Sequence, residues 1–262
     1  MNHTRSRVAA FAVRALTLLS LAAAAALMSA PASAKSVVLP WIAQTRGALA
    51  PSTDLYVHNP GRAPLAVRLA LVPVGGGEAV PCGARAVDPS ATAFAADARR
   101  RLCGDAAAAG ILVASFDDGA EAPVLTSSDT FAARDGSRFT RTSPPMDEAD
   151  AALPGQAQHL AGLRQDGGSR TALWLYNPAA EGGEYDVIYR GLDGSELATL
   201  PAVRIGAGKL RQISPPQHPL PAAAIASAFT VEIVVRSGAL LSVGIVVDDR
   251  AAAATVSEGK TR

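Results

Sequence analysis

The sequence predicts an all-β fold made of two tandem immunoglobulin-like antiparallel β-sandwich units related by internal duplication. Three observations support it: an internal repeat, short segments of alternating apolar and polar residues between Gly and Pro turns, and few helical patterns. The chain has 262 residues, of which 49% are hydrophobic and 5% aromatic, with 23 Gly and 18 Pro. This length is enough for one or two domains, each with its own core.

The repeat is clearest where residues 53–60, TDLYVHNP, align with residues 171–178, TALWLYNP, at an offset of 118 positions. Four of these eight positions are identical. The repeat divides the chain into a first unit over 35–137, a connector over 138–156 and a second unit over 157–262. Each unit has about the size of one small β domain.

Each unit is expected to consist of strands. In both copies of the repeat, leucine or valine alternates with larger residues, which places the two sets on opposite faces of a sheet. Further strands are expected over 65–72, 110–116, 124–131, 185–189, 229–235 and 240–247. The last two are expected to form a hairpin around Ser237-Gly238, and Asp193-Gly194 marks another. Short helices are expected over 95–102 and 222–228.

The first 34 residues have the pattern of a secretory signal peptide. Three arginines and no acid precede an apolar stretch of 14 residues over 15–28, and Ala32-Ser33-Ala34 supplies a small-residue cleavage site. A membrane span needs about 20 apolar residues, so cleavage is favoured over a retained anchor. We therefore expect a periplasmic or secreted protein with no membrane span after leader cleavage.

The connector allows two interpretations. Its prolines and its acidic run, Asp147, Glu148 and Asp150, are typical of an exposed segment. Residues 138–141, RFTR, alternate with period two and could instead form a strand carried from one half onto the other.

The charge is almost balanced, with 24 basic against 23 acidic residues. The leader takes three basic residues and no acid, which leaves a net charge of −2. So weak a field is not expected to capture nucleic acid or an anionic membrane. The single basic run, Arg99-Arg100-Arg101, lacks interleaved aromatics and is interpreted as a solvated face.

The two cysteines, Cys82 and Cys103, are 21 positions apart. An oxidising compartment favours joining them, and closing a loop of this size stabilises a fold by about 3 kcal/mol in the chain-entropy model. A free, reactive thiol pair is the alternative, but no C-x-x-C motif is present. We predict a structural disulfide in the first unit.

No catalytic motif accompanies the histidines that follow the leader, since both a G-x-S-x-G elbow and an H-E-x-x-H helix are missing. His58 aligns with Tyr176 of the second copy, so a packing or surface role is favoured over catalysis. His159 and His218 are interpreted as solvated loop residues. We therefore predict no catalytic residue, no metal ligand and no cofactor.

Acidic residues cluster as Asp117-Asp118, in the connector, and as Asp248-Asp249. Paired carboxylates can perform acid–base chemistry or bind Ca²⁺, but none follows a calcium-loop pattern, and solvated turns are favoured. Residues 206–209, GAGK, resemble half of a phosphate loop without its full spacing or its helix, and are interpreted as a turn.

Trp41, Trp174, Tyr56 and Tyr176 could form a platform on which sugars stack. Tyr56 and Trp174, however, hold the same strand position in the two copies of the repeat. Packing in the core or between sheets is therefore favoured.

The second unit resembles a tandem β-sandwich repeat of secreted bacterial proteins. The matching residues are Leu160-Ala161-Gly162-Leu163, Arg170-Thr171-Ala172-Leu173, Asn177, Asp193-Gly194, Gly208 with Gln212, and Val247-Asp248-Asp249. The first unit fits with Ser52 in place of the arginine and with Ser128-Asp129 near its closing strand. The resemblance covers nearly all of the chain after the leader, and it implies a pair of β-sandwiches without catalytic residues.

More weakly, the chain is similar to periplasmic pilus-assembly chaperones, which are exported and contain two immunoglobulin-like domains. Residues 55–67, a strand, an asparagine and a second strand, carry this similarity. It implies Arg46 as a possible partner-binding residue that anchors a subunit carboxylate. Such chaperones donate an edge strand of alternating large apolar residues, whereas residues 124–131 read VLTSSDTF.

Together these observations predict an exported, non-enzymatic binding or structural module of the cell envelope that has a protein partner there. One alternative is a pilus-assembly chaperone that acts through Arg46 on fimbrial subunits. Another is a secreted hydrolase that uses the connector carboxylates.

Overall fold

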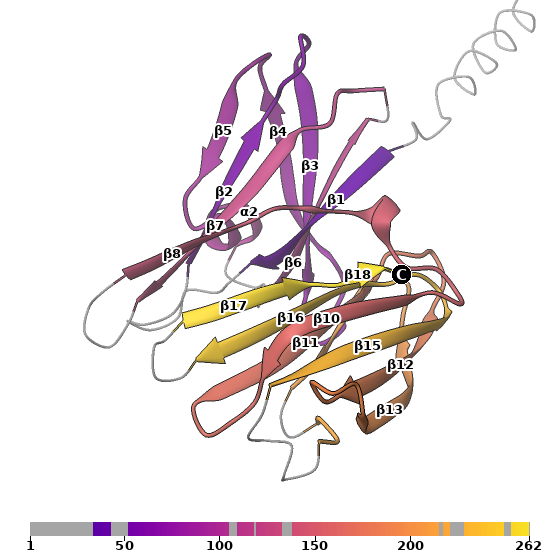
Figure 1. The fold of residues 1–262 in the computed structure, drawn as a ribbon. Coiled ribbons are helices and arrows are strands. Elements are labelled where there is room, and N and C mark those ends of the chain that lie inside the picture. The colour runs from indigo at the N-terminus through magenta and orange to yellow at the C-terminus, as the bar shows by residue number, and fades with distance from the viewer. Residues whose placement is uncertain are drawn as a thin grey trace, which may run out of the picture. The chain divides into compact units, whose positions relative to one another are not determined.

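Strands make up most of the structure, a computed structural model that describes residues 34–42, 52–104, 109–117, 119–132, 138–214, 217–220, 228–248 and 253–261. These strands form four sheets (Figure 1), and every pairing with a described register is antiparallel. The prediction of an all-β fold with antiparallel sheets is confirmed. No helix in the described part of the chain is long and apolar enough to cross a membrane.

Two sheets form the N-terminal half. Sheet I contains, in spatial order, β4 (Val80–Val87), β3 (Leu65–Pro73), β6 (Gly110–Asp117), β1 (Ala34–Ile42) and β9 (Met146–Asp147). Sheet II contains β5 (Thr92–Ala95), β2 (Ser52–His58), β7 (Val124–Ala132) and β8 (Arg138–Ser143). Their facing side chains form one buried cluster, in which Leu55, Leu69 and Phe116 take part. The predicted disulfide between Cys82 and Cys103 is present and joins β4 to helix α2 (Ala98–Cys103).

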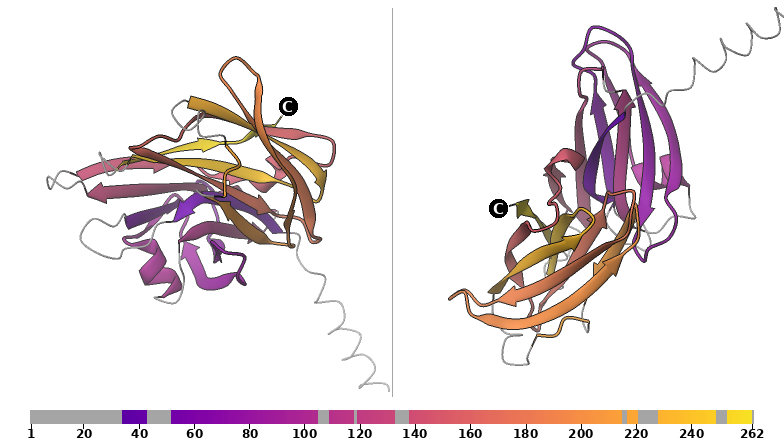
Figure 2. Two further views of the ribbon diagram at one scale, coloured as in Figure 1. Left: turned by 90° about the horizontal axis from the view of Figure 1, so that it is seen from below. Right: turned by 90° about the vertical axis from the view of Figure 1, so that its right-hand side faces the viewer.

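Two further sheets form the C-terminal half. Sheet III contains β14 (Lys209–Ile213), β11 (Ser169–Asn177), β16 (Leu241–Asp248) and β17 (Ala253–Glu258). Sheet IV contains β13 (Glu196–Ile205), β12 (Gly183–Arg190), β15 (Ala228–Ser237), β10 (Ala157–Arg164) and β18 (Lys260–Thr261). A second buried cluster fills the space between them and includes Leu173, Tyr185 and Phe229. In two further views, the indigo-to-magenta and the orange-to-yellow strands form separate groups (Figure 2).

The two halves have the same strand order. Sheet I becomes sheet IV when β4, β3, β6, β1 and β9 are replaced by β13, β12, β15, β10 and β18. Sheet II becomes sheet III when β5, β2, β7 and β8 are replaced by β14, β11, β16 and β17. This is the relationship that a duplication predicts.

A third buried cluster lies between the outer face of sheet I and the outer face of sheet III. Val38, Val72 and Ile111 come from sheet I, and Trp174 and Val243 come from sheet III. Because sheet III has the core on one face and this cluster on the other, β11 and β16 are buried on both faces. Residues from Lys35 to Arg262 accordingly form one compact unit.

One predicted hairpin is wrong. β15 and β16 belong to different sheets, so the chain around Gly238 crosses from sheet IV to sheet III instead of turning back. Leu240 is fully buried at this crossing and pairs with Ala152 of the connector. Two apolar strands joined by a Gly-containing turn are compatible with a hairpin in one sheet and with a connection between two sheets. The second arrangement occurs here because it buries both faces of β16.

The predictions for the other hairpin, the connector and the two helices can be compared with the structure. The hairpin at Asp193-Gly194 is confirmed, since β12 pairs with β13 across it and Gly194 has a φ of 83°. The connector contributes β8, which pairs with β7, and β9, which pairs with β1, so it carries no strand onto the C-terminal half. The first helix begins at Ala98 rather than at residue 95, because β5 extends to Ala95. The second predicted helix falls on residues outside the described part, apart from Ala228, which begins β15.

Candidate functional site

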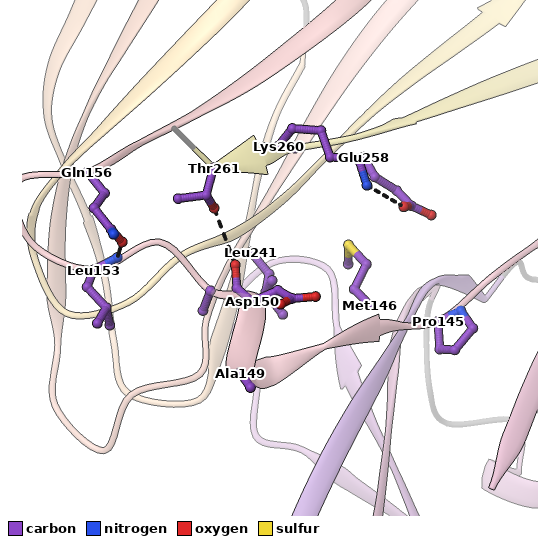
Figure 3. Close-up of a pocket in the computed structure, with 12 residues that line it drawn as sticks. Pro145, Met146, Ala149, Asp150, Leu153, Gln156, Leu241, Glu258, Lys260 and Thr261 are labelled. Atoms are coloured by element: carbon purple, nitrogen blue, oxygen red, sulfur yellow. Dashed lines mark hydrogen bonds and ion pairs between the residues drawn. The ribbon is translucent and has the colours of Figure 1, made fainter. Parts of the chain in front are cut away.

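A cleft of about 450 Å³ lies where the connector meets the C-terminal strands (Figure 3). Residues between 145 and 156 form one wall, and residues 258–261 with Leu241 form the other. The Thr261 hydroxyl donates to the Asp150 carbonyl at 3.3 Å, and Lys260 Nζ lies 3.7 Å from Glu258 Oε2. Several polar groups of the cleft are therefore bonded to one another.

The connector carboxylates have different roles. Asp147 Oδ1 accepts from the backbone N–H of Ala149 at 2.9 Å and caps a 3-10 turn, η1 (Glu148–Asp150). Glu148 Oε1 accepts from the Tyr176 hydroxyl at 3.3 Å, and burial raises the pKa of Glu148 despite this bond. Burial, with the Glu148 charge, also raises the pKa of Tyr176. Asp150 is exposed and lines the cleft, so two of these three carboxylates support local structure.

The histidines lie in three different environments. His58 is half-buried on β2, with Nδ1 3.0 Å from the Thr92 hydroxyl, and His159 is half-buried on β10. The interpretation of His218 as a solvated residue is wrong. Its Nε2–H donates to the Thr171 carbonyl at 2.8 Å, and its Nδ1 accepts from the Tyr189 hydroxyl at 2.7 Å. Burial lowers the pKa of His218, which acts as a neutral support inside the C-terminal sandwich.

The remaining candidates do not come together in one site. Asp117 is exposed at the end of β6, Asp248 ends β16, and Gly208 forms the predicted turn between β13 and β14. In the basic run, Arg99 is buried and donates to the Gly104 carbonyl at 3.3 Å, so only part of the run is the predicted solvated face. The predicted partner-binding residue Arg46 lies outside the described residues, as do Asp118 and Asp249.

The aromatic residues separate into a buried set and an exposed set. Trp174 and Tyr176 are only 4% and 6% exposed in the cluster between sheets I and III, as the packing interpretation predicted. Tyr56 is 38% exposed on the outer face of sheet II and lies beside Phe94, which is 56% exposed. Their ring centroids are 4.9 Å apart. The side chain of Trp41 lies outside the described residues.

The outer face of sheet II surrounds this pair with small polar side chains. Leu55, Val57 and Leu125 point into the core, so the residues that alternate with them point outward. The outward residues whose side chains are described are Ser52, Asp54, Tyr56, His58, Thr92, Phe94, Val124, Thr126, Ser128, Thr130, Thr140 and Thr142. None of these described side chains belongs to lysine or arginine, and seven carry a hydroxyl on serine or threonine. The register places Ala132 of β7 and Arg138 of β8 in the next row of the same face. The repeat points to Tyr56, whereas no short sequence pattern points to Phe94, which the pairing of β5 with β2 brings beside it.

A buried polar group lies on the inner face of the same sheet. Asp129 is fully buried, accepts from the Thr53 hydroxyl at 2.6 Å and lies 2.8 Å from Arg141. Burial raises the pKa of Asp129, while Thr53 and Arg141 act in the opposite direction. This group ties β7 to β2 and β8. β7, the strand compared with a chaperone's donor strand, is therefore interior and offers no free edge.

No protein-family model, curated protein or solved structure matches this chain. Within the described residues, no group of histidine, cysteine, aspartate or glutamate side chains is arranged to hold a metal ion.

Proposed function

We propose that this chain is an exported, non-enzymatic binding module of the cell envelope, and that the outer face of sheet II is its binding surface. The observation that supports this best is the exposed pair Tyr56 and Phe94, which lies on a sheet face whose described outward side chains include no lysine or arginine. Large aromatic side chains are costly to leave in water and are typical of recognition surfaces. At the same strand position in the other half, Trp174 is buried in a contact.

Export is supported by two features. The compact unit begins at Lys35, the residue that follows the predicted cleavage site. The disulfide between Cys82 and Cys103 suits an oxidising compartment. A non-enzymatic role is supported by the bonds that Asp147 and Glu148, two of the three carboxylates in the hydrolase alternative, make to Ala149 and Tyr176.

The experiment follows the full chain with its own leader in a bacterial host. We expect the protein in the periplasm or medium to begin at Lys35, as determined by mass spectrometry. The purified protein should sediment with cell envelopes isolated from the same host, and the double variant Tyr56→Ala/Phe94→Ala should do so about tenfold less well.

Two controls make this test specific. Leu192, 76% exposed in the β12–β13 turn, offers a matched apolar truncation, and Leu192→Ala should leave sedimentation unchanged. Leu153→Ala, in the cleft, should also leave it unchanged. A chain retained in the cytosol would contradict export, and sedimentation that Leu153→Ala alone abolishes would assign binding to the cleft.

A further inference from the structure

We propose that the outer face of sheet II binds a neutral polysaccharide, with sugar rings stacked on Tyr56 and Phe94 and hydroxyl contacts along β7 and β8. This inference rests on the proposed binding function and names its ligand class. It depends on three observations: the arrangement of the side chains on this face, the absence of lysine and arginine among its described outward side chains, and the charges on the sheet face of a second copy that could otherwise cover it.

The strand register places the side chains in rows across the sheet. Phe94, Tyr56 and Thr126 lie opposite one another on β5, β2 and β7. The next row contains Asp54, Ser128 and Thr142, and the row after it contains Ser52, Thr130 and Thr140. Neighbouring strands are about 4.8 Å apart. The face therefore combines an aromatic patch with a field of closely spaced hydroxyls.

This combination suits a sugar chain chemically. The C–H face of a pyranose ring is apolar and stacks on aromatic rings, while its equatorial hydroxyls donate and accept hydrogen bonds at the rim. Tyr56 and Phe94 supply the apolar contact. Serine and threonine hydroxyls can each donate one hydrogen bond and accept others, so they can pair with sugar hydroxyls in either direction.

The charge of the face favours a neutral ligand. Its described outward side chains include one carboxylate, Asp54, whose Oδ1 accepts from the backbone N–H of Asp97 at 2.9 Å. None of the outward side chains that the structure describes belongs to lysine or arginine, so this part of the face has no group to neutralise the phosphates of a nucleic acid or the carboxylates of an acidic polysaccharide. Arg138 takes a position one row beyond Thr140, at the margin of this part of the face.

A second copy of the chain is a poor occupant. Within the chain, the equivalent face of sheet III is covered by apolar side chains from sheet I, including Val38 and Val72. The surface that would continue this stacking from another copy is the outer face of sheet IV. That face instead carries the ion pairs Arg190–Glu232, Arg204–Glu184 and Arg236–Asp186. Covering these charges would require their desolvation.

The experiment measures retention of the purified chain on microcrystalline cellulose, chitin and cross-linked dextran, with immobilised double-stranded DNA and alginate as anionic controls. We expect retention on at least one neutral polysaccharide, little change between low and high salt, and no retention on the anionic probes. Tyr56→Ala/Phe94→Ala should weaken binding about tenfold, and Thr142→Val, which removes one hydroxyl at nearly constant volume, should weaken it several-fold. Leu192→Ala should bind like the wild type.

The results separate the two proposals. If envelope sedimentation depends on Tyr56 and Phe94 but none of the three neutral polysaccharides retains the chain, the ligand class is overturned and the binding function stands. Retention that the double variant leaves unchanged overturns the assignment of the polysaccharide to this face. If concentration-dependent self-association is lost in the double variant, a second copy is the occupant and the polysaccharide proposal is overturned.

Discussion

At the scale of single residues, the bonds of two buried asparagines explain why both copies of the repeat contain an asparagine at the end of their strand. Asn59 donates to the carbonyls of Ala63 and Val87 at 2.8 and 2.9 Å, and its Oδ1 accepts from the backbone N–H of Gly61. Asn177 donates to the carbonyl of Glu181 and to that of Ile205. In both halves these carbonyls lie four and 28 positions after the asparagine. The asparagine of the repeat therefore fastens the end of one sheet to the other sheet.

Replacing either asparagine should cost stability. Asn59→Ala leaves the Val87 carbonyl buried without that donor, and an unsatisfied buried group costs about 1–3 kcal/mol. We expect a loss of about 2–4 kcal/mol in the free energy of unfolding for Asn59→Ala or Asn177→Ala. Urea unfolding measures it. Arg62→Ala, an exposed change in the same turn, should stay within about 0.5 kcal/mol of the wild type, and an equal loss there would contradict this role.

His218 makes stability depend on pH. Burial lowers its pKa in the folded chain below the ordinary value of 6.5. Below that value the unfolded chain binds a proton that the folded chain does not, so the free energy of unfolding should fall as pH decreases below about 6.5.

His218→Gln, which keeps an acceptor and a donor, tests this dependence. The difference between variant and wild type in the free energy of unfolding, measured from pH 8 to pH 5, isolates the contribution of His218. We expect the variant to show a weaker decline towards acid pH. His159→Gln, at a half-buried strand position, is the matched control, and a parallel pH profile for wild type and His218→Gln would refute the prediction.

At the scale of elements, the disulfide holds helix α2 against β4 in the N-terminal half. The double variant Cys82→Ala/Cys103→Ala should lose about 3 kcal/mol, the value for a loop of this size. A reducing agent should destabilise the wild type by a similar amount and leave the variant unchanged. Two titratable thiols in protein recovered from the periplasm would show that the bond does not form there.

The ion pair between Asp129 of β7 and Arg141 of β8 in the N-terminal half has no equivalent at the corresponding position of the C-terminal half. Strand registers place Val246 of β16 where Asp129 lies in β7, and Thr255 of β17 where Arg141 lies in β8. The C-terminal half thus fills the equivalent position with an apolar side chain. A buried charge needs its partner, whereas an apolar pair of similar volume can replace both.

Arg141→Leu should therefore be costly, because it removes this partner of the buried Asp129 carboxylate. We expect a loss of about 3–5 kcal/mol in the free energy of unfolding. The double variant Asp129→Val/Arg141→Leu should recover most of that loss, since it follows the example of Val246. Chemical denaturation of both variants decides the matter: a double variant no more stable than the single one would contradict this account.

Sequence alone predicts the elements better than their partners. Alternation and turn residues locate most strands, because side-chain direction and turn geometry are local properties. The hairpin proposed around Gly238 failed because the choice of sheet depends on burial across both faces of β16. Phe94 was missed for a related reason: it joins Tyr56 only through the pairing of β5 with β2, which no short pattern encodes.

At the scale of the whole molecule, the two halves present equivalent faces to different surroundings. The outer face of sheet III is covered by sheet I, while Tyr56 and Phe94 on the outer face of sheet II are exposed. Their shared strand order and the equivalent bonds of Asn59 and Asn177 support the proposed duplication. After a duplication, one copy of a contact face can be used within the chain while the other stays available for a ligand.

Because of this difference, substitutions at the equivalent residues Trp174 and Tyr56 should have very different effects on the free energy of unfolding. Trp174→Ala removes a large side chain from the cluster between sheets I and III and should cost about 3–5 kcal/mol. Tyr56→Ala, at the same repeat position but on the exposed face, should cost less than about 1 kcal/mol.

Trp174→Ala should also make the two halves unfold less cooperatively, because the cluster that it disrupts joins them. Calorimetry of the wild type is expected to show one unfolding transition, and that of Trp174→Ala a broadened or double one. Tyr56→Ala should keep the single transition while weakening envelope binding, which separates the packing role from the recognition role. Equal destabilisation by the two substitutions would mean that the outer face of sheet II is a packed interface, with no surface left free for a ligand.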